Sequence, residues 1–597
     1  MTEEIASRRA LRESSRTPLQ RSWIIRWVLV GIAAALLFLV GWVGIRGLIA
    51  KNELESALPL VSDLKDDLKA VDLSGAQATV DIVAARTANA RALTSDPLWR
   101  ALELVPFAGP NLTGFRELAA VTDDIAQGVM VPVASLGDTL DPKALKPVDG
   151  RIDVSLFVSA GPVVSDARRA LEAAYAEIEA IDTSRAIGAI QDAHGQLESM
   201  LKPMMPLIVQ ADDLVGMLPT MLGADGPRSY LVVFQNNSES RALGGHAGSW
   251  VEISVDDGKI DLARQSTVHE LKTGGVPVIQ LSQERLGLWP GAGADPSNVT
   301  MVPDLGLSAQ TASAFWAKKW GIQPDAVVFI DPVALGYILD ATGPVELPTG
   351  DVISVENGAE FLLNGVYLKY PLNADQDAVF DSIADRVFGA VTGGDFDPKK
   401  LVEAALKSGE EHRLLTWFFD EAERDAFSEL PFFLPPLETN DDVATFGVYI
   451  TDNLGSKMTY YVDAEVALGQ KECAAGGVQY QVQLKLSNIV TPELGAVLPS
   501  YVGRGVGGSL RILVSLYGPP GSQFITGQGW DPTFIPAVGP DGEYPVMMQR
   551  LVLNPSQTVN ANFILVAPDD SLDRKLEAYV TPMARPIPVT DDAEFTC

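Results

Sequence analysis

One uncharged apolar run close to the N-terminus constrains this chain more than any other feature. Residues 27–45 read WVLVGIAAALLFLVGWVGI, which is 19 positions without a charged side chain. As a helix rising about 1.5 Å per residue, the run spans ~28 Å, close to the hydrocarbon thickness of a bilayer. Trp23, Trp27 and Trp42 stand near its ends, where indole rings favour the membrane interface. The pattern predicts a transmembrane helix over 27–47.

Charges before the run predict its orientation. Residues 1–26 contain six arginines and three glutamates, so this tail is basic. By the positive-inside rule the tail is cytoplasmic and the remaining ~550 residues are extracellular. A cleaved signal peptide is one alternative, but its apolar region has only about 7–15 residues, and Arg46 and Lys51 follow this run without a small-residue cleavage site. The core helix of a soluble protein is the other alternative, which the arginine asymmetry disfavours.

Composition narrows the classes of function. The chain has 45 basic and 77 acidic residues and a net charge of −32. Binding nucleic acid requires several Lys or Arg contacts to phosphates, so a nucleic-acid partner is excluded. With 47% hydrophobic and 20% charged residues, the chain is suited to packed cores rather than to disorder. At roughly 100–200 residues per domain, a chain of 597 residues folds into several domains.

The two cysteines, Cys473 and Cys597, fall in the predicted extracellular part, where disulfides form. They are too few for a disulfide scaffold or a four-thiolate zinc site. We predict that they pair, which would hold the C-terminal tail against its own domain. Two unpaired thiols remain the alternative, because spacing alone does not decide it.

Three extracellular regions together predict a multidomain α+β chain. Residues 48–226 carry apolar side chains at helical spacing, for example Leu171, Tyr175 and Ile178, with proline and glycine between segments. This predicts a helical stalk or bundle. His194 falls on the same apolar stripe and is interpreted as a packed residue rather than a ligand.

The second region, residues 227–435, alternates strand and helix patterns and predicts a mixed α/β domain. Asp257 and Gly258 lie between two strand patterns and predict a β-hairpin, whereas 357–370 and 375–391 read as helices. Residues 441–597 contain strands with a period of two, as in VQYQVQLKL at 478–486. They predict a C-terminal β-sandwich.

Two long motifs carry a resemblance to a known family. They are YLVVFQNNSESRALGGHAGSWVEISVDDGKI at 230–260 and MVPDLGLSAQTASAFWAKKWGIQPDAVVFIDPVALGYILDATGPVELP at 301–348. Both resemble a family of bacterial, mainly actinobacterial, membrane-anchored envelope proteins that is defined only by a domain of unknown function. The resemblance is strong over 227–391 and implies a place in the cell envelope but no activity.

Residues 321–348 are also distantly similar to the strand–helix–strand segment of LytR–CpsA–Psr phosphotransferases. These enzymes have one N-terminal anchor and attach glycopolymers from polyprenyl-pyrophosphate carriers to the cell wall. The similarity implies an α/β domain like theirs and places their catalytic Asp and paired Arg-Gln within 357–391. This chain departs from that pattern, because it reads DQDAVFDSIADR at 375–386 and its arginine, Arg386, stands further along.

Phosphotransfer chemistry requires cations around the phosphates and often Mg²⁺ held by carboxylates, so Mg²⁺ is expected if this activity is present. Arg241 is the best cation candidate, because Gly244 and Gly245 follow it and let backbone N–H groups approach an anion. An ordinary glycine turn, with the arginine tying the loop to a carboxylate, is the alternative.

Five further candidates come from the resemblance or from their positions at element ends: Arg264, Asp304, Lys369, Asp375 and Asp377. A solvated surface residue is the alternative for Arg264, and a helix cap is the alternative for Asp304. The last three lie in the segment that resembles the catalytic region.

Other enzyme classes lack their motifs. The four histidines, His194, His246, His269 and His412, form no zinc-ligand spacing, so no metal site is expected from them. The sequence contains no G-x-S-x-G elbow and no Walker loop. Three hypotheses remain, in this order: an envelope protein that binds an envelope polymer or lipid-linked precursor, a structural spacer and docking module, and an active phosphotransferase.

Overall fold

The chain divides into two compact units, each described here by itself. The computed structural model describes residues 18–69, 73–137, 145–473, 477–569, 572 and 574–593. One unit comprises Met1–Asp141 with Val158–Val215, and the other comprises Pro142–Phe157 with Gly216–Cys597. The first 17 residues of the predicted cytoplasmic tail and Cys597 lie outside the described residues.

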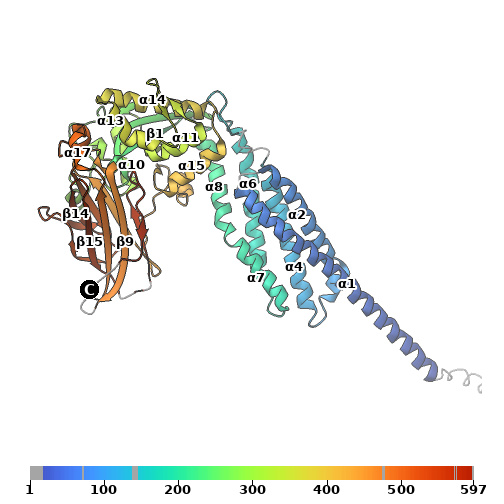
Figure 1. Cartoon of the computed structure of the whole chain (residues 1–597). Coiled ribbons are helices and arrows are strands. Elements are labelled where there is room, and N and C mark those ends of the chain that lie inside the picture. The colour runs from blue at the N-terminus through green and yellow to red at the C-terminus, as the bar shows by residue number, and fades with distance from the viewer. Residues whose placement is uncertain are drawn as a thin grey trace, which may run out of the picture. The chain divides into compact units, whose positions relative to one another are not determined.

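The first unit is helical, as the apolar periodicity predicted (Figure 1, blue to green helices). The helices up to the first strand are α1 (Pro18–Lys69), α2 (Leu73–Thr94), α3 (Pro97–Leu102), α4 (Gly109–Ile125), the π-helical turn η1 (Ala126–Met130), α5 (Val131–Ser135), α6 (Ser155–Ala180), α7 (Gly188–Leu201) and α8 (Met204–Met221). His194 lies on α7 with its Nε2 atom 2.9 Å from the Ile178 carbonyl oxygen, which agrees with a packing role.

Helix α1 contains the predicted span and continues well beyond it. Among the described residues, one helix is long and apolar enough to cross a membrane, and Arg26–Val61 meets that test by length and composition. The side chains of the apolar run are mostly exposed, as expected of a segment that lipid surrounds. Beyond the run, α1 packs into the bundle through small residues such as Ala50 and Ala57.

Helices α1, α2 and α4 pack closely because alanines face one another. Ala50, Ala90 and Ala119 share one cluster, and Ala57 shares the next cluster with Ala126, the first residue of η1. Small side chains let helix axes approach, which increases van der Waals contact. Ala50 clusters with Ala119, and Ala57, seven residues later, clusters with Ala126, which is also seven residues later. Helix α4 therefore runs in the same direction as α1.

The second unit contains a five-stranded mixed sheet in the order β3-β2-β1-β4-β7. Its strands are β1 (Arg228–Arg241), β2 (Gly244–Asp256), β3 (Lys259–Thr267), β4 (Ala326–Ile330) and β7 (Leu414–Phe418). β1 and β4 are parallel, and the other neighbours are antiparallel. The predicted hairpin is confirmed, because β2 and β3 pair on either side of Asp257 and Gly258, both of which have positive φ.

Helices and short segments surround this sheet. They are α9 (Gln283–Leu288), the 3-10 turn η2 (Pro296–Asn298), α10 (Leu305–Trp320), α11 (Pro332–Thr342), the small hairpin β5 (Val345–Glu346) and β6 (Val352–Ile353), α12 (Gly358–Glu360), η3 (Phe361–Gly365), α13 (Val366–Lys369), α14 (Asn373–Thr392), α15 (Pro398–Glu410) and α16 (Glu421–Phe427). The helices expected at 357–370 and 375–391 are confirmed. The buried face of α10, including Phe315 and Trp316, packs against Val233 of β1 and Phe329 of β4.

The C-terminal part of this unit has two five-stranded sheets, β12-β15-β10-β9-β17 and β13-β14-β11-β8-β16. Its elements are β8 (Val443–Asp452), η4 (Met458–Tyr461), β9 (Val462–Cys473), β10 (Gly477–Asn488), α17 (Pro492–Val497), α18 (Ser500–Gly503), β11 (Leu510–Tyr517), β12 (Gln523–Gln528), β13 (Ala537–Asp541), β14 (Tyr544–Leu553), β15 (Thr558–Val566), β16 (Lys575–Val580) and β17 (Val589–Thr590).

The two C-terminal sheets share one hydrophobic core. Alternate residues of β10, among them Val482 and Leu484, contribute to it together with Phe446 and Val448 of β8, as the period of two predicted. The same core extends to helices α11, α13 and α14 of the mixed-sheet part. Cys473 ends β9 and is buried; since its predicted partner lies outside the described residues, the bond stays a prediction.

Candidate functional site

The last six residues of β1 form a run of buried polar side chains. They read NNSESR from Asn236 to Arg241, and each is at most 9% exposed. β4 pairs with β1 only as far as Phe234, so this end of β1 lies against β2, η4 and β8 instead. The Thr459 hydroxyl of η4 accepts the N–H of Ser240 at 3.0 Å and donates to the Ser238 carbonyl at 2.7 Å. These bonds supply the partners that a buried backbone requires.

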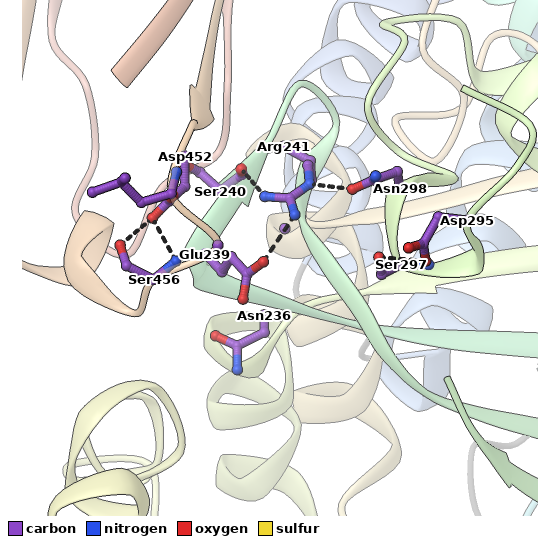
Figure 2. Close-up of polar contacts among 12 residues, drawn as sticks. Asn236, Glu239, Ser240, Arg241, Asp295, Ser297, Asn298, Asp452 and Ser456 are labelled. Atoms are coloured by element: carbon purple, nitrogen blue, oxygen red, sulfur yellow. Dashed lines mark hydrogen bonds and ion pairs between the residues drawn. The ribbon is translucent and has the colours of Figure 1, made fainter. Parts of the chain in front are cut away.

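Arg241 lies at the centre of this polar run (Figure 2). Its Nη2 atom donates to Glu239 at 2.8 Å, its Nε atom to Asn298 Oδ1 at 2.9 Å and its Nη1 atom to the Ser240 carbonyl at 2.9 Å. All three guanidinium nitrogens are therefore bonded within the protein, and the side chain is only 6% exposed. Arg241 links β1 to η2.

Glu239 is shared between two cations. Its second oxygen accepts from Lys457 Nζ at 2.8 Å. Burial by itself would raise the pKa of Glu239, but the charges of Lys457 and Arg241 outweigh burial and hold that pKa far below its usual range. Burial, together with the charges of Lys457 and Arg241, lowers the pKa of His246 to about 3. At neutral pH the site therefore holds a carboxylate, two cations and an uncharged imidazole.

The glycines after Arg241 serve close strand packing. A Cβ atom on Gly245 would lie 2.2 Å from the Asn236 carbonyl carbon, and one on Gly244 would lie 2.4 Å from the Gln235 side chain. The N–H of Gly245 donates to Gln235 Oε1 at 2.7 Å, so this amide already has its acceptor. The geometry here corresponds to the alternative kept open above, an arginine that ties a glycine turn to a carboxylate.

Arg264 has its own partner on the neighbouring strand. Its Nη1 atom donates to both carboxylate oxygens of Glu252, at 3.0 and 2.9 Å. Glu252 is buried and also accepts from Trp316 Nε1 of α10 at 3.1 Å. The Arg264 guanidinium lies 6.0 Å from the ring centre of Trp320. Arg264 thus connects β3 to β2 and to α10.

The candidates of 357–391 lie on α13 and α14. Lys369 forms an ion pair with Asp351, and Asp375 is exposed in the first turn of α14. Partial desolvation raises the pKa of Asp377, which His269 opposes. Desolvation also raises the pKa of Asp381, and the charges of Asp377, Asp385 and Glu270 raise it further. This face of α14 is acidic, whereas bound phosphates require cations.

Magnesium, expected if phosphotransferase activity is present, stays a prediction. Within the part of the chain that the structure describes, no three His, Cys, Asp or Glu side chains converge closely enough to hold a metal ion. Mg²⁺ prefers near-octahedral oxygen coordination, which one or two carboxylates share with water and substrate phosphates.

Asp304 leads to a second arrangement, around Arg285. Asp304 is the N-cap of α10 and accepts the N–H of Leu307 at 2.8 Å. Its other oxygen accepts from Arg285 Nη2 at 2.8 Å, and Arg285 Nε donates to Asp541 at 2.6 Å. The Tyr517 hydroxyl donates to the second oxygen of Asp541 at 2.8 Å. These bonds connect α9, α10, β11 and β13.

A cavity of about 520 Å³, open to solvent, adjoins this arrangement. The Arg285 side chain is 26% exposed, and its Nη1 atom has no partner among the described residues, unlike Nε and Nη2. A residue that lines the cavity therefore keeps one donor. The lining residues are Gln280, Leu281, Ser282, Glu284, Arg285, Leu307, Pro540, Asp541 and Gly542.

The structure distributes the predicted candidates over four places. Arg241, Gly244 and Gly245 lie together, Lys369, Asp375 and Asp377 lie on α13 and α14, and Arg264 and Asp304 each have separate partners. Sequence reasoning missed Lys457 and Arg285. Lys457 lies 218 residues from Glu239, and Arg285 lies 256 residues from Asp541, so no local motif indicates either pair.

Comparison with known proteins identifies one part of the chain. Residues 225–367 match the model of a family described as a protein of unknown function (DUF4012). The match runs from the start of β1 into α13 and includes Arg241, Asp304 and Arg285, but not Asp541. No curated protein and no solved structure matches the chain. The match supports a domain-of-unknown-function family for this segment and brings no activity with it.

Proposed function

We propose that this protein is anchored in the membrane of a bacterial cell envelope and binds a neutral glycan of that envelope in the cavity at Arg285, without chemical turnover. The observation that carries the proposal is the cavity itself, whose volume of about 520 Å³ lies within the range of small-molecule sites. The open Nη1 donor of Arg285 gives the cavity a fixed polar group, and ion pairs to Asp304 and Asp541 hold that group in position.

The charges around the cavity favour a neutral ligand. Arg285 is shared by two carboxylates, and Glu284 adds a further acid to the lining. A pyrophosphate or a polyphosphate would meet net negative charge there. Sugar hydroxyls both donate and accept hydrogen bonds, so they match the guanidinium donor of Arg285 and the side-chain amide of Gln280.

The location in the envelope is supported by the N-terminal part of the chain. Helix α1 contains a run of membrane-spanning length, and the residues before it are rich in arginine. With the tail in the cytoplasm, the acidic bulk lies outside the cell. We extend the proposal to a β-sandwich formed by the two C-terminal sheets, and to a disulfide between Cys473 and Cys597 in that oxidising compartment. Non-reducing mass spectrometry tests the bond: two alkylated thiols would exclude it.

The phosphotransferase alternative has less support. In the LytR–CpsA–Psr reading, Arg241 would hold the pyrophosphate of a polyprenyl carrier, but its three nitrogens already bond to Glu239, Asn298 and Ser240. Desolvation raises the pKa of Asp381 beside Asp377, and the charges of Asp377, Asp385 and Glu270 raise it further, so this place is acidic. The spacer alternative is supported by α1, which continues past the apolar run to Lys69, about 36 Å for residues 46–69 at about 1.5 Å per residue.

Calorimetric titration of the full chain in detergent tests the proposal with three probes. They are a neutral galactan oligosaccharide, poly(glycerol phosphate) and farnesyl pyrophosphate. The cavity is blocked in a Gln280→Trp variant, which leaves every ion pair of Arg285 in place. Arg285→Gln removes the charged donor, and a hydrogen bond to a charged group contributes about 1.5–3 kcal/mol, so affinity falls about 10- to 100-fold.

A matched control is available in the same unit. Arg550 forms an ion pair with Asp531 at a similar exposure, 21% against 26% for Arg285, and does not line the cavity. The proposal expects the galactan to bind wild type and Arg550→Gln equally, and to lose binding in Gln280→Trp. Binding that survives Gln280→Trp would reject the cavity. If farnesyl pyrophosphate binds with the same dependence on Arg285, the ligand is a lipid-linked precursor and not a neutral glycan. Release of a product from it would establish turnover.

A further inference from the structure

The loop between α3 and α4 exposes five consecutive apolar residues. It reads LVPFA from Leu104 to Ala108, and all five are exposed. Leu104 is 86% and Phe107 is 92% exposed. Single exposed apolar side chains are common on protein surfaces, but an uninterrupted exposed run of this kind is typical of an interaction surface. Phe107 also has a φ of 69°, a left-handed conformation that is unfavourable for a residue with a side chain.

Contacts within the helical unit place the neighbouring helix α3 beside the end of the apolar run of α1. Trp99 of α3 is buried, and its ring lies 3.3 Å from where a Cβ atom on Gly47 would stand. Arg46, the first charged residue after the run, donates to the Leu93 carbonyl at 2.9 Å and pairs with Asp96. The turn that leads into α3 therefore lies at the level where the apolar run ends.

The loop itself lies deeper along the run. Ala119 of α4 and Ala50 of α1 share one cluster with Ala90 of α2, and α4 runs in the same direction as α1. Gly109 stands ten residues before Ala119, which corresponds to about 15 Å of helix. The start of α4 is consequently level with α1 near Val40, inside the uncharged run of residues 27–45. In Figure 1 this loop forms a tip of the bundle beside the emerging part of α1.

The charged residue next to the loop is paired, and several backbone groups of the loop are hydrogen-bonded. Glu103 next to it is paired with Arg116 at 2.7 Å, so no unpaired acid stands at its start. The N–H of Val105 donates to the Leu102 carbonyl, the N–H of Ala108 to Pro106 and the N–H of Gly109 to Val105. Asn111 donates to the Phe107 carbonyl and accepts from the N–H of Ile187, a further exposed apolar residue. Satisfied backbone groups are what a lipid environment requires.

We propose that the loop Leu104–Ala108 inserts into the outer leaflet of the membrane that α1 crosses, and gives the helical unit a second contact with the bilayer. The apolar side chains enter the acyl region, and Arg100, exposed on the preceding helix α3, reaches the phosphate headgroups. The occupant is a lipid bilayer because the loop is level with a segment whose own length and composition fit lipid. The proposal rests on α1 as a membrane span.

The test uses the full chain reconstituted in vesicles of phosphatidylcholine and phosphatidylglycerol. A Phe107→Trp variant adds one indole to the loop, and an Ile535→Trp variant adds one at an equally exposed position of the other unit (Ile535 is 87% exposed). Emission is compared with wild type in vesicles whose lipids are brominated near the headgroup or near the chain ends. We expect the added indole at 107 to emit at shorter wavelength and to be quenched by shallow bromines, and the indole at 535 to show neither effect.

Each other outcome rejects the proposal in a recognisable way. Emission at 107 that matches the emission at 535 would mean that the loop stays in water. A shorter emission wavelength without bromine quenching, together with a dimer by light scattering, would mean that a second copy covers the loop. Alkaline washing separates failure of the anchor from failure of the loop: chain released from the vesicles means that α1 is not a span, whereas retained chain with an unquenched indole at 107 rejects only the loop contact.

Discussion

The polar network at the end of β1 and the cavity at Arg285 contain the same kinds of side chain and differ in what those side chains leave free. In both, an arginine bonds to a carboxylate and to a second oxygen acceptor. Arg241 is 6% exposed and uses all three nitrogens inside the protein, whereas Arg285 is 26% exposed and keeps one nitrogen without a partner among the described residues.

This difference separates a stabilising role from a binding role. When every donor of a buried charge is satisfied, removing one of its partners lowers the stability of the fold, because an unpaired charge is left buried. A partly exposed charge held by acids at the wall of a cavity contributes little to stability but keeps a donor for a ligand. The comparison indicates a structural role for Arg241 and, under the proposed function, a recognition role for Arg285; four measurements test it.

The largest effect is expected for Glu239→Gln. This change leaves Lys457 and Arg241 buried without their shared carboxylate, which destabilises the second unit by about 3–5 kcal/mol. Urea denaturation followed by tryptophan fluorescence in detergent measures the loss as a lower midpoint. Glu465→Gln is the control, because its pair with Lys485 is exposed and contributes about 0–1 kcal/mol. Equal midpoints for the two variants would contradict the role assigned to the network.

Gly245→Ala is expected to follow. Its new methyl group would lie 2.2 Å from the Asn236 backbone, and overpacking of this kind costs about 1–3 kcal/mol. Gly248→Ala is the matched control on the same strand, since its nearest contact would be 3.9 Å away, at His246. A lower melting temperature for Gly245→Ala alone, measured by circular dichroism, would support close packing of β1 and β2. Two equal temperatures would be evidence against it.

Acid should destabilise the second unit through His246. Its folded pKa of about 3 lies below the ordinary value of 6.5, so the unfolded chain binds a proton that the folded chain excludes as pH falls below 6.5. Between pH 6.5 and pH 5 this amounts to about 2 kcal/mol of lost stability. The depressed pKa of Glu239 acts in the same direction, but only at lower pH. The profile of His246→Gln should be flatter over this interval; a profile parallel to wild type would reject the assignment.

The smallest effect is expected for Asp304→Asn, the same acid-to-amide change as Glu239→Gln but made at the cavity. Asparagine caps a helix as well as aspartate does, so α10 keeps its cap and only the charge beside Arg285 is removed. Because both side chains of this pair are partly exposed, the loss is about 0.5 kcal/mol, measured by the same urea midpoint. A loss as large as that for Glu239→Gln would remove the distinction between the two regions.

Local pattern was sufficient for much of the architecture. The apolar run predicted a helix of spanning length, the spacing of Leu171, Tyr175 and Ile178 predicted α6, and Asp257-Gly258 predicted the β2–β3 hairpin. Each of these signals comes from residues that are neighbours along the chain, where helical or strand periodicity decides which face is buried.

The partners of Arg241 and Arg285 could not be predicted from local sequence patterns. Arg241 and its glycines look like an anion loop. The residues just before Arg241 are bonded to Lys457 and Thr459, more than two hundred residues later, and this pairing makes the strand end part of the interior. Arg285 stands in a short helix with no motif around it and becomes a recognition candidate only where the β13 strand brings Asp541 to it. In both cases tertiary pairing, rather than propensity, determines which nitrogen atoms meet water.

The unbroken course of α1 has a mechanical consequence for the helical unit. The helix passes from the apolar run into the bundle without a loop, and Arg46 is fastened there to Leu93 and Asp96. Under the proposed membrane anchoring, tilting of this unit relative to the bilayer normal is therefore restricted to the tilt of the helix itself. Replacing α1 by a lipid tether joined through a glycine-rich linker would keep the protein at the same membrane and release its orientation.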